Sequence, residues 1–264
     1  MIKKLINVVT GESRRNKQLV KTLDDFLANA KSNSLTDEQA KRNLEEGVVE
    51  LVNYDGQHSS NGLLITDDGY FLTAGHCLKE SPLRYVLHDG RKCKIEKVCA
   101  YGKRSTLMNL DIALAKAKIP GARKARQYRF YQESIKPASP VDLYCRWDTH
   151  LLLRSGKILA DSLGLYFSNP PDDIVFSDNK TIPGDSGGVL ATVDFEILSL
   201  QKGHILLRSF SEKDSYLRFQ KEYPWKEYAV TRIFKKPYPA NSTNVKYHLD
   251  LVEDYRKKVA ENLK

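Results

Sequence analysis

Short apolar segments separated by turn signals run through most of this chain, and they constrain its fold more than any other feature. Gly62–Ile65 and Tyr70–Thr73 flank the turn signal Asp67-Asp68-Gly69, and a second such signal stands at Asp89-Gly90. An Asp-Gly pair between two β-rich runs is typical of a hairpin. Many short strands at such intervals predict a barrel or a sandwich. The other strand-like segments are residues 48–52, 83–87, 92–100, 111–117, 141–146, 151–153, 157–160, 174–177, 188–191, 196–200, 205–210 and 228–234.

Both ends of the chain have a helical pattern instead. Leu19, Leu23 and Phe26 recur at helical spacing, and Thr36-Asp37-Glu38-Gln39 resembles a capping box ahead of a short helix. Apolar residues between 245 and 263 also follow a helical period. We expect the N-terminal extension either to pack against the main body or to serve as a partner-binding arm. The expected division is a helical extension at 1–46, a first β-rich unit at 47–122, a second β-rich unit at 123–240 and a C-terminal helix at 241–264.

The charge and hydropathy patterns fit a soluble protein with a basic surface. The 264 residues carry a formal net charge of +9, but Lys and Arg are scattered rather than gathered in one block. Scattered charge is typical of a solvated surface, although a basic balance can also favour nucleic acid, anionic membranes or acidic substrates. We find no signal-peptide pattern and no apolar run of membrane-spanning length. A cytoplasmic protein that does not bind membranes is therefore expected.

The four cysteines predict mostly free thiols. Cys93 and Cys99 fall on one expected strand, where they would lie about 20 Å apart at about 3.3 Å per residue. That separation is too large for a disulfide. No Cys-x-x-Cys pair occurs among these two, Cys77 and Cys145, and free thiols suit a reducing compartment. No metal-ligating cluster or phosphate-binding loop is evident, so neither a metal nor a cofactor is expected.

Three short motifs carry residues with catalytic chemistry. His76 ends Thr-Ala-Gly-His directly after an expected strand, Asp111 lies in Leu-Asp-Ile-Ala-Leu, and Ser186 lies in Pro-Gly-Asp-Ser-Gly-Gly. A serine hydroxyl becomes a good nucleophile only when a base removes its proton, and histidine can be that base near neutral pH. A buried carboxylate fixes the imidazole tautomer and stabilises the imidazolium. Each motif alone is weak, but all three in this order on a β-rich background indicate a catalytic triad.

With these motifs, the chain resembles the chymotrypsin-like serine peptidases over roughly residues 47–210. The absent disulfide pattern and the proline before Gly-Asp-Ser look closer to bacterial trypsin-like and Deg-type peptidases than to secreted digestive enzymes. The resemblance implies an all-β fold of two six-stranded antiparallel barrels with the active site between them. It implies that His76, Asp111 and Ser186 are catalytic, and that the N–H groups of Gly184 and Ser186 form the oxyanion hole.

Two positions depart from the secreted members of this family. In those proteins a newly cut N-terminus pairs with the aspartate before the nucleophile, which corresponds to Asp185, but here Gly47-Val48-Val49-Glu50 runs straight into the first strand. Asp185 needs another partner or a solvated loop, because a buried unpaired carboxylate is costly. We therefore expect constitutive activity, or control by the N-terminal extension. Asn61 stands where the disulfide partner of Cys77 would be, so an unpaired, structural Cys77 is expected.

The resemblance also suggests which residues meet the substrate. Lys180 stands where trypsin has the aspartate that binds basic side chains, so a preference for Arg or Lys is not expected. Lys180 and Thr181 could instead bind an acidic side chain with help from His204, or Lys180 could turn to solvent. Ser199-Leu200-Gln201 matches the strand that adds the substrate as an extra β-strand. Ser199 also matches a serine that helps hold the catalytic aspartate.

Three functions compete on this reading. The first is an intracellular serine endopeptidase that cleaves a protein or peptide substrate. The second is a catalytically weak protein- or peptide-binding module on the same fold, which would not react with a serine-directed phosphonate. The third is a basic nucleic-acid-binding protein, which would bind in a strongly salt-dependent way. Basic residues are not interleaved with aromatics in a nucleic-acid motif, so specific nucleic-acid binding is not expected. The sequence leaves the oligomeric state open.

Overall fold

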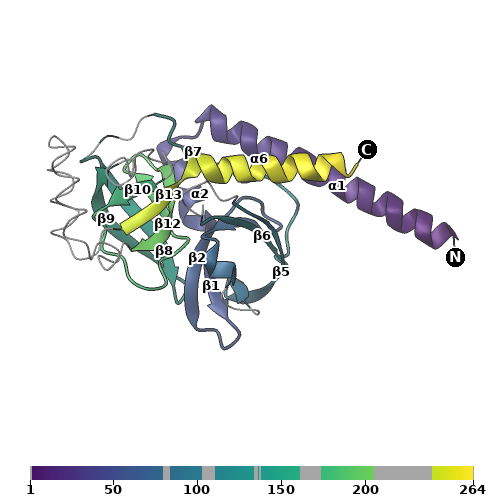
Figure 1. Ribbon diagram of the computed structural model, residues 1–264, viewed down its shortest axis with the longest axis horizontal. Helices are drawn as coiled ribbons and strands as arrows, with labels where there is room; N and C mark the ends of the chain where they lie inside the picture. Colours follow the sequence, from purple (N-terminus) through teal and green to yellow (C-terminus); the bar gives the residue numbers. More distant parts are fainter. Residues whose placement is uncertain are drawn as a thin grey trace, which may run out of the picture.

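Two β-rich halves lie side by side, and two long helices lie along the first half and reach the near edge of the second (Figure 1). The structure, a computed structural model, describes residues 2–79, 84–102, 111–133, 136, 138–160, 174–204 and 240–263. The strands predicted at 205–210 and 228–234, and the first residue of the one predicted at 83–87, lie outside the described residues.

The first half is a closed antiparallel barrel of six strands in the order β1-β2-β3-β6-β5-β4. Both predicted hairpins are confirmed, because β2 pairs with β3 across Asp67-Asp68-Gly69 and β4 pairs with β5 across Asp89-Gly90. Asp89 and Gly90 both have positive φ, as a two-residue type I′ turn requires. The strands are β1 (Val48–Asn53), β2 (His58–Leu64), β3 (Tyr70–Thr73), β4 (Arg84–His88), β5 (Arg91–Tyr101) and β6 (Ala113–Ala117).

The second half is a sheet in the order β11-β8-β9-β10-β13-β12-β7. Because β11 also pairs with β12, six antiparallel strands close a second barrel, and β7 joins β12 in parallel. The predicted two-barrel fold class is confirmed. The strands are β7 (Arg129–Phe130), β8 (Pro140–Trp147), β9 (His150–Ala160), β10 (Ile174–Ser177), β11 (Val189–Thr192), β12 (Glu196–His204) and β13 (Ala240–Asn244).

Strand β13 corrects the predicted C-terminal boundary. Residues 241–244 were expected in the terminal helix, but they pair with β10 on one side and with β12 on the other. Helix α6 (Val245–Glu261) begins only after Asn244, whose side chain accepts a hydrogen bond from the N–H of Lys246. Asn244 is a suitable N-cap because its short side-chain oxygen satisfies a backbone donor of the first turn.

The N-terminal extension consists of α1 (Ile2–Ser32) and α2 (Asp37–Gly47). The predicted capping box of α2 is confirmed, with reciprocal hydrogen bonds between Thr36 and Gln39. Helix α1 packs along α6 (Figure 1), and Leu23 and Phe26 share one buried cluster with barrel residues such as Leu72. Burial of each such side chain stabilises the fold by about 1.5–3 kcal/mol. The extension is therefore part of the hydrophobic core rather than a detachable arm.

Among the residues that the structure describes, no helix combines the length and the apolar composition needed to cross a bilayer.

Candidate active site

Three segments that are distant in the sequence bring His76, Asp111 and Ser186 into one hydrogen-bonded row. His76 begins the short helix α3 (His76–Lys79) after β3, Asp111 stands just before β6, and Ser186 lies between β10 and β11. His76 Nδ1 is 2.5 Å from Asp111 Oδ2, and His76 Nε2 is 3.0 Å from Ser186 Oγ. The backbone N–H of His76 also donates to Asp111 Oδ1 at 2.7 Å. Both carboxylate oxygens thus hold the same histidine and fix the orientation of its ring.

The electrostatics of this row favour charge separation between His76 and Asp111. The hydrogen bond to Asp111, followed by the contact with Cys77, raises the pKa of His76 above its ordinary 6.5 although burial opposes the shift. Burial by itself would raise the pKa of Asp111, but the hydrogen bonds and charge of His76 lower it below its usual value. The carboxylate therefore stays ionised and stabilises the imidazolium once the ring accepts a proton.

Hydrogen bonds and one positive φ angle fix the backbone around Ser186. Gly184 has a φ of +102°, a region that glycine adopts without strain. The N–H of Asp185 donates to the Ile182 carbonyl at 3.1 Å, and the N–H of Asn61 donates to the Ser186 carbonyl at 2.7 Å. Within the described part of the chain, no hydrogen bond uses the N–H of Gly184 or Ser186. Both predicted oxyanion-hole donors are thus available to a ligand oxygen.

Asp185 has the partner that the sequence left unidentified. The Asp185 side chain is only 2% exposed, and the guanidinium of Arg154, on β9, forms an ion pair with its Oδ2. The same oxygen accepts the N–H of Ile182 at 2.7 Å. A cation from the body of the second barrel therefore neutralises the buried carboxylate, so the loop needs no newly cut N-terminus to balance this charge.

Replacing Arg154 by methionine should lower kcat/KM by about 10²-fold, because the backbone donors of the loop lose their anchor. Stability should fall as well, since removal of one partner from a buried ion pair typically costs about 3–5 kcal/mol. Kinetics on a peptide substrate and thermal unfolding measure the two effects. Arg256→Met is the matched control, because Arg256 pairs with Glu253 on the surface of α6. Equal losses in the two variants would contradict a specific role for Arg154.

Asn61 joins the two barrels at the position where a disulfide partner of Cys77 was considered. Its Nδ2 donates to the Gly184 carbonyl at 3.0 Å, and its Oδ1 accepts the N–H of Arg146, on β8, at 2.6 Å. Cys77 is a free, buried thiol whose Sγ lies 3.7 Å from His76 Nε2. Hydrogen bonds of the Asn61 amide thus link the first barrel to the nucleophile loop.

The segment predicted to pair with the substrate is buried between neighbouring strands. Ser199, Leu200 and Gln201 are buried in β12, with β11 or the loop before it on one side and β13 on the other. Of the described strands, only β13 pairs with Gly203 and His204. Ser186 Oγ donates to the Lys202 carbonyl at 3.2 Å. Strand β11 begins at Val189, so among the described residues no strand pairs with Lys202–His204 on the side opposite β13.

The remaining predicted specificity residues lie on both sides of Ser186 in the sequence, with Lys180 and Thr181 before it and His204 after it. Lys180 is exposed and Thr181 is half-buried. The exposure of Lys180 fits the alternative in which its side chain reaches solvent. His204 ends β12, where its backbone pairs with Ala240.

Sequence reasoning missed Arg154 and Lys202. The sequence indicated only that Asp185 needs another partner or a solvated loop, and nothing local singled out one of the 42 Lys and Arg residues. Lys202 lies one residue beyond the predicted edge, and its position depends on where β11 ends. Both assignments rest on contacts between segments far apart in the sequence.

Comparisons with known proteins identify the fold. No protein-family model and no curated protein matches the sequence. The MamO protease domain of Magnetospirillum magneticum matches with a TM-score of 0.52 and 14% identity, over 80% of this chain and 97% of that one. A serine endoprotease from Yersinia pestis matches with a TM-score of 0.56 and 14% identity, over 84% and 67%. The protease Rv3671c of M. tuberculosis, in its inactive form, matches with a TM-score of 0.53 and 15% identity, over 83% and 93%.

Proposed function

We propose that this chain, which has the fold of the trypsin-like and Deg-type serine proteases, is a serine endopeptidase that uses His76, Asp111 and Ser186 as its triad. The observation that carries the proposal is the single row of contacts, 2.5 Å from carboxylate to Nδ1 and 3.0 Å from Nε2 to the serine hydroxyl. In this geometry each group can perform its part of acyl transfer without a large rearrangement.

The first half of the proposed reaction forms an acyl-enzyme. Ser186 Oγ attacks the scissile carbonyl carbon while its proton passes to His76 Nε2. The carbonyl oxygen becomes an oxyanion, which accepts hydrogen bonds from the N–H groups of Gly184 and Ser186. The C–N bond then breaks, and the imidazolium returns its proton to the leaving amine. Asp111 remains ionised and stabilises the imidazolium throughout.

The second half consumes water. His76 takes a proton from a water molecule, whose oxygen attacks the acyl carbon, and the same two N–H groups stabilise the second oxyanion. Collapse of this intermediate breaks the bond to Ser186 Oγ, which recovers its proton from His76. The substrate backbone would pair with Lys202–His204 as an added strand, which places the scissile bond beside Ser186.

Covalent labelling tests this proposal. A fluorophosphonate probe should react with the folded protein, and mass spectrometry of the digest should locate the adduct on the peptide that contains Ser186. Heat-unfolded protein serves as the control, because an unactivated serine hydroxyl does not react. Cleavage of a peptide library should accompany labelling. Absence of both would favour the catalytically weak binding module, and an adduct on another serine would contradict the assigned nucleophile.

A further inference from the structure

A buried glutamate–histidine pair connects the first barrel to the nucleophile loop. His58 Nδ1 lies 2.9 Å from Glu50 Oε1, and His58 Nε2 lies 2.9 Å from the Gly184 carbonyl oxygen. Both side chains are 2% exposed. Glu50 comes from β1 and His58 from the start of β2, so the pair spans from the first barrel to the loop that carries Ser186. Neither residue has a part in the triad chemistry.

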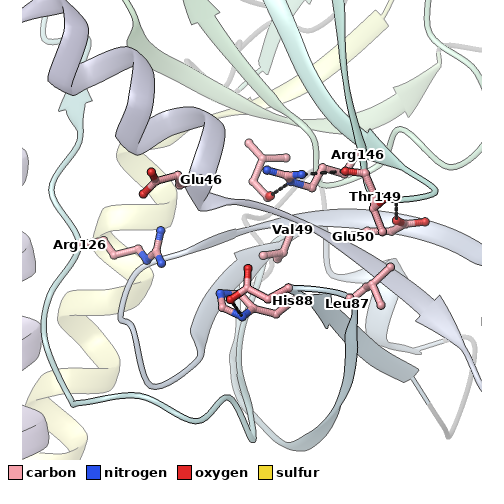
Figure 2. Close-up of a pocket in the computed structure, with 11 residues that line it drawn as sticks. Glu46, Val49, Glu50, Leu87, His88, Arg126, Arg146 and Thr149 are labelled. Carbon is pink, nitrogen blue, oxygen red and sulfur yellow. Dashed lines mark hydrogen bonds and ion pairs between the residues drawn. The ribbon is translucent and has the colours of Figure 1, made fainter.

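The second barrel holds the glutamate in place. Glu50 Oε1 accepts the N–H of Asp148 at 3.2 Å, and Oε2 accepts the N–H of Thr149 at 3.0 Å. Figure 2 places Glu50 and Thr149 together on the wall of a cavity of about 410 Å³, with Arg146 beside them. The Arg146 side chain in turn donates to the Thr149 carbonyl at 2.9 Å. The turn between β8 and β9 thus fixes the carboxylate that orients His58.

The histidine ring is placed to act on the loop backbone. It stacks on Trp147 with 4.0 Å between ring centroids, and a Cβ on Gly184 would approach both rings within 3 Å. A carbonyl oxygen only accepts hydrogen bonds, so Nε2 is placed to donate to the Gly184 carbonyl. Nδ1 faces the carboxylate of Glu50.

Hydrogen bonds fix the peptide plane that follows Gly184 at both ends. Its carbonyl oxygen accepts from His58 Nε2 and from Asn61 Nδ2, and its N–H, on Asp185, donates to the Ile182 carbonyl. This plane connects the two residues before Ser186, so its orientation sets the directions of the N–H groups of Gly184 and Ser186. A loop peptide that loses one of its hydrogen bonds can rotate, and the N–H groups of Gly184 and Ser186 would then no longer point at the substrate oxygen.

We propose that His58, oriented by Glu50, is a positioning residue for the oxyanion hole, holding the Gly184 carbonyl so that the two loop N–H groups point at the substrate oxygen. This inference rests on the proposed peptidase function. It adds that docking of the two barrels and organisation of the oxyanion hole are coupled, because one chain of hydrogen bonds runs from the β8–β9 turn through Glu50 and His58 to Gly184.

Two substitutions at His58 separate the effect of its hydrogen bonds from the effect of its stacking on Trp147. His58→Phe keeps a ring to stack on Trp147 but removes both ring nitrogens, and it should lower kcat by about 10²-fold with KM changed less than about twofold. His58→Gln keeps a donor at nearly the Nε2 position, so its kcat should lie between those of wild type and His58→Phe. His88→Phe is the matched control, because His88 also lies beside a carboxylate, Asp89 at 3.3 Å, and should leave kcat unchanged.

Hydrogen–deuterium exchange of residues 182–188 supplies a readout that needs no turnover. Exchange should rise in His58→Phe and remain at the wild-type level in His88→Phe. Glu50→Gln, which keeps the side-chain volume, should show a smaller rise in exchange. It replaces His58→Phe in this test if that variant does not fold. Wild-type kcat and exchange in His58→Phe, or no recovery in His58→Gln, would overturn the proposal. If wild type itself neither cleaves nor labels, the peptidase function fails and exchange alone decides the role of His58.

Discussion

A Ser186→Ala variant is expected to lose on the order of 10⁶-fold in kcat on any peptide that the wild type cleaves. Alanine removes the only oxygen that lies 3.0 Å from His76 Nε2 in the triad row, so no acyl-enzyme can form. The remaining rate would come from substrate binding and the oxyanion-hole donors acting on water. Thermal stability should change little, because the hydroxyl is small and the backbone of Ser186 keeps its hydrogen bond from Asn61.

A double variant makes this prediction sharper. Since the serine and the histidine act as one unit, His76→Ala combined with Ser186→Ala should be no slower than Ser186→Ala alone. Ser59→Ala is the matched control, because Ser59 Oγ donates to the Leu51 carbonyl at 3.0 Å and has no part in the row. If the losses in kcat caused by the two single substitutions multiply in the double variant, the two residues act independently, and a shared step is contradicted. Steady-state kinetics with active-site titration measures each rate.

An Asp111→Asn variant is expected to lose about 10⁴-fold in kcat and to change its pH dependence. Asp111 accepts hydrogen bonds from the backbone N–H and from Nδ1 of His76, and an amide cannot accept from both groups with separate oxygens. The wrong tautomer of His76 then faces Ser186. The neutral side chain also removes the main cause that raises the pKa of His76.

The sign of the pH effect follows from the role of the base. Only neutral His76 can accept the serine proton, so kcat/KM rises with pH through the pKa of this group in the free enzyme. In wild type that midpoint should lie above 6.5, the ordinary value for histidine, and in Asp111→Asn it should move to lower pH. Asp89→Asn, next to His88, is the control that should leave the profile unchanged. A midpoint that stays in place in Asp111→Asn would show that another group titrates.

Arg154 and His58 hold the nucleophile loop from opposite sides. Arg154 neutralises Asp185 from the second barrel, while His58 reaches the Gly184 carbonyl from the first. Arg154 lies on β9 and His58 on β2, so neither contact uses the N-terminus of the chain. This arrangement fits the expectation of constitutive activity, and the burial of α1 in the core argues against a removable N-terminal control segment.

Local patterns predicted most of the elements. Alternating apolar residues and Asp-Gly turns are short-range signals, so the hairpins of the first barrel and the capping box of α2 could be read directly. Ala240–Asn244 could not, because its sequence has no run of apolar or β-branched residues. It becomes a strand because β10 and β12 offer backbone partners on both sides.

The sequence by itself determined the succession of short strands and turns, and which histidine, aspartate and serine stand in the motifs, because turn chemistry and reactive side chains depend on a few neighbouring residues. The expectation of two barrels came from the resemblance that those motifs carry. Only the tertiary structure decided that Arg154 meets Asp185, that His58 meets Gly184, and that Gln201, unlike the residues after it, is covered by the segment before β11. These contacts depend on strand register and on how the barrels pack. A buried charge or carbonyl forms a hydrogen bond with whichever suitable group the fold brings within reach. The residues next to that group in the sequence do not identify it as the partner.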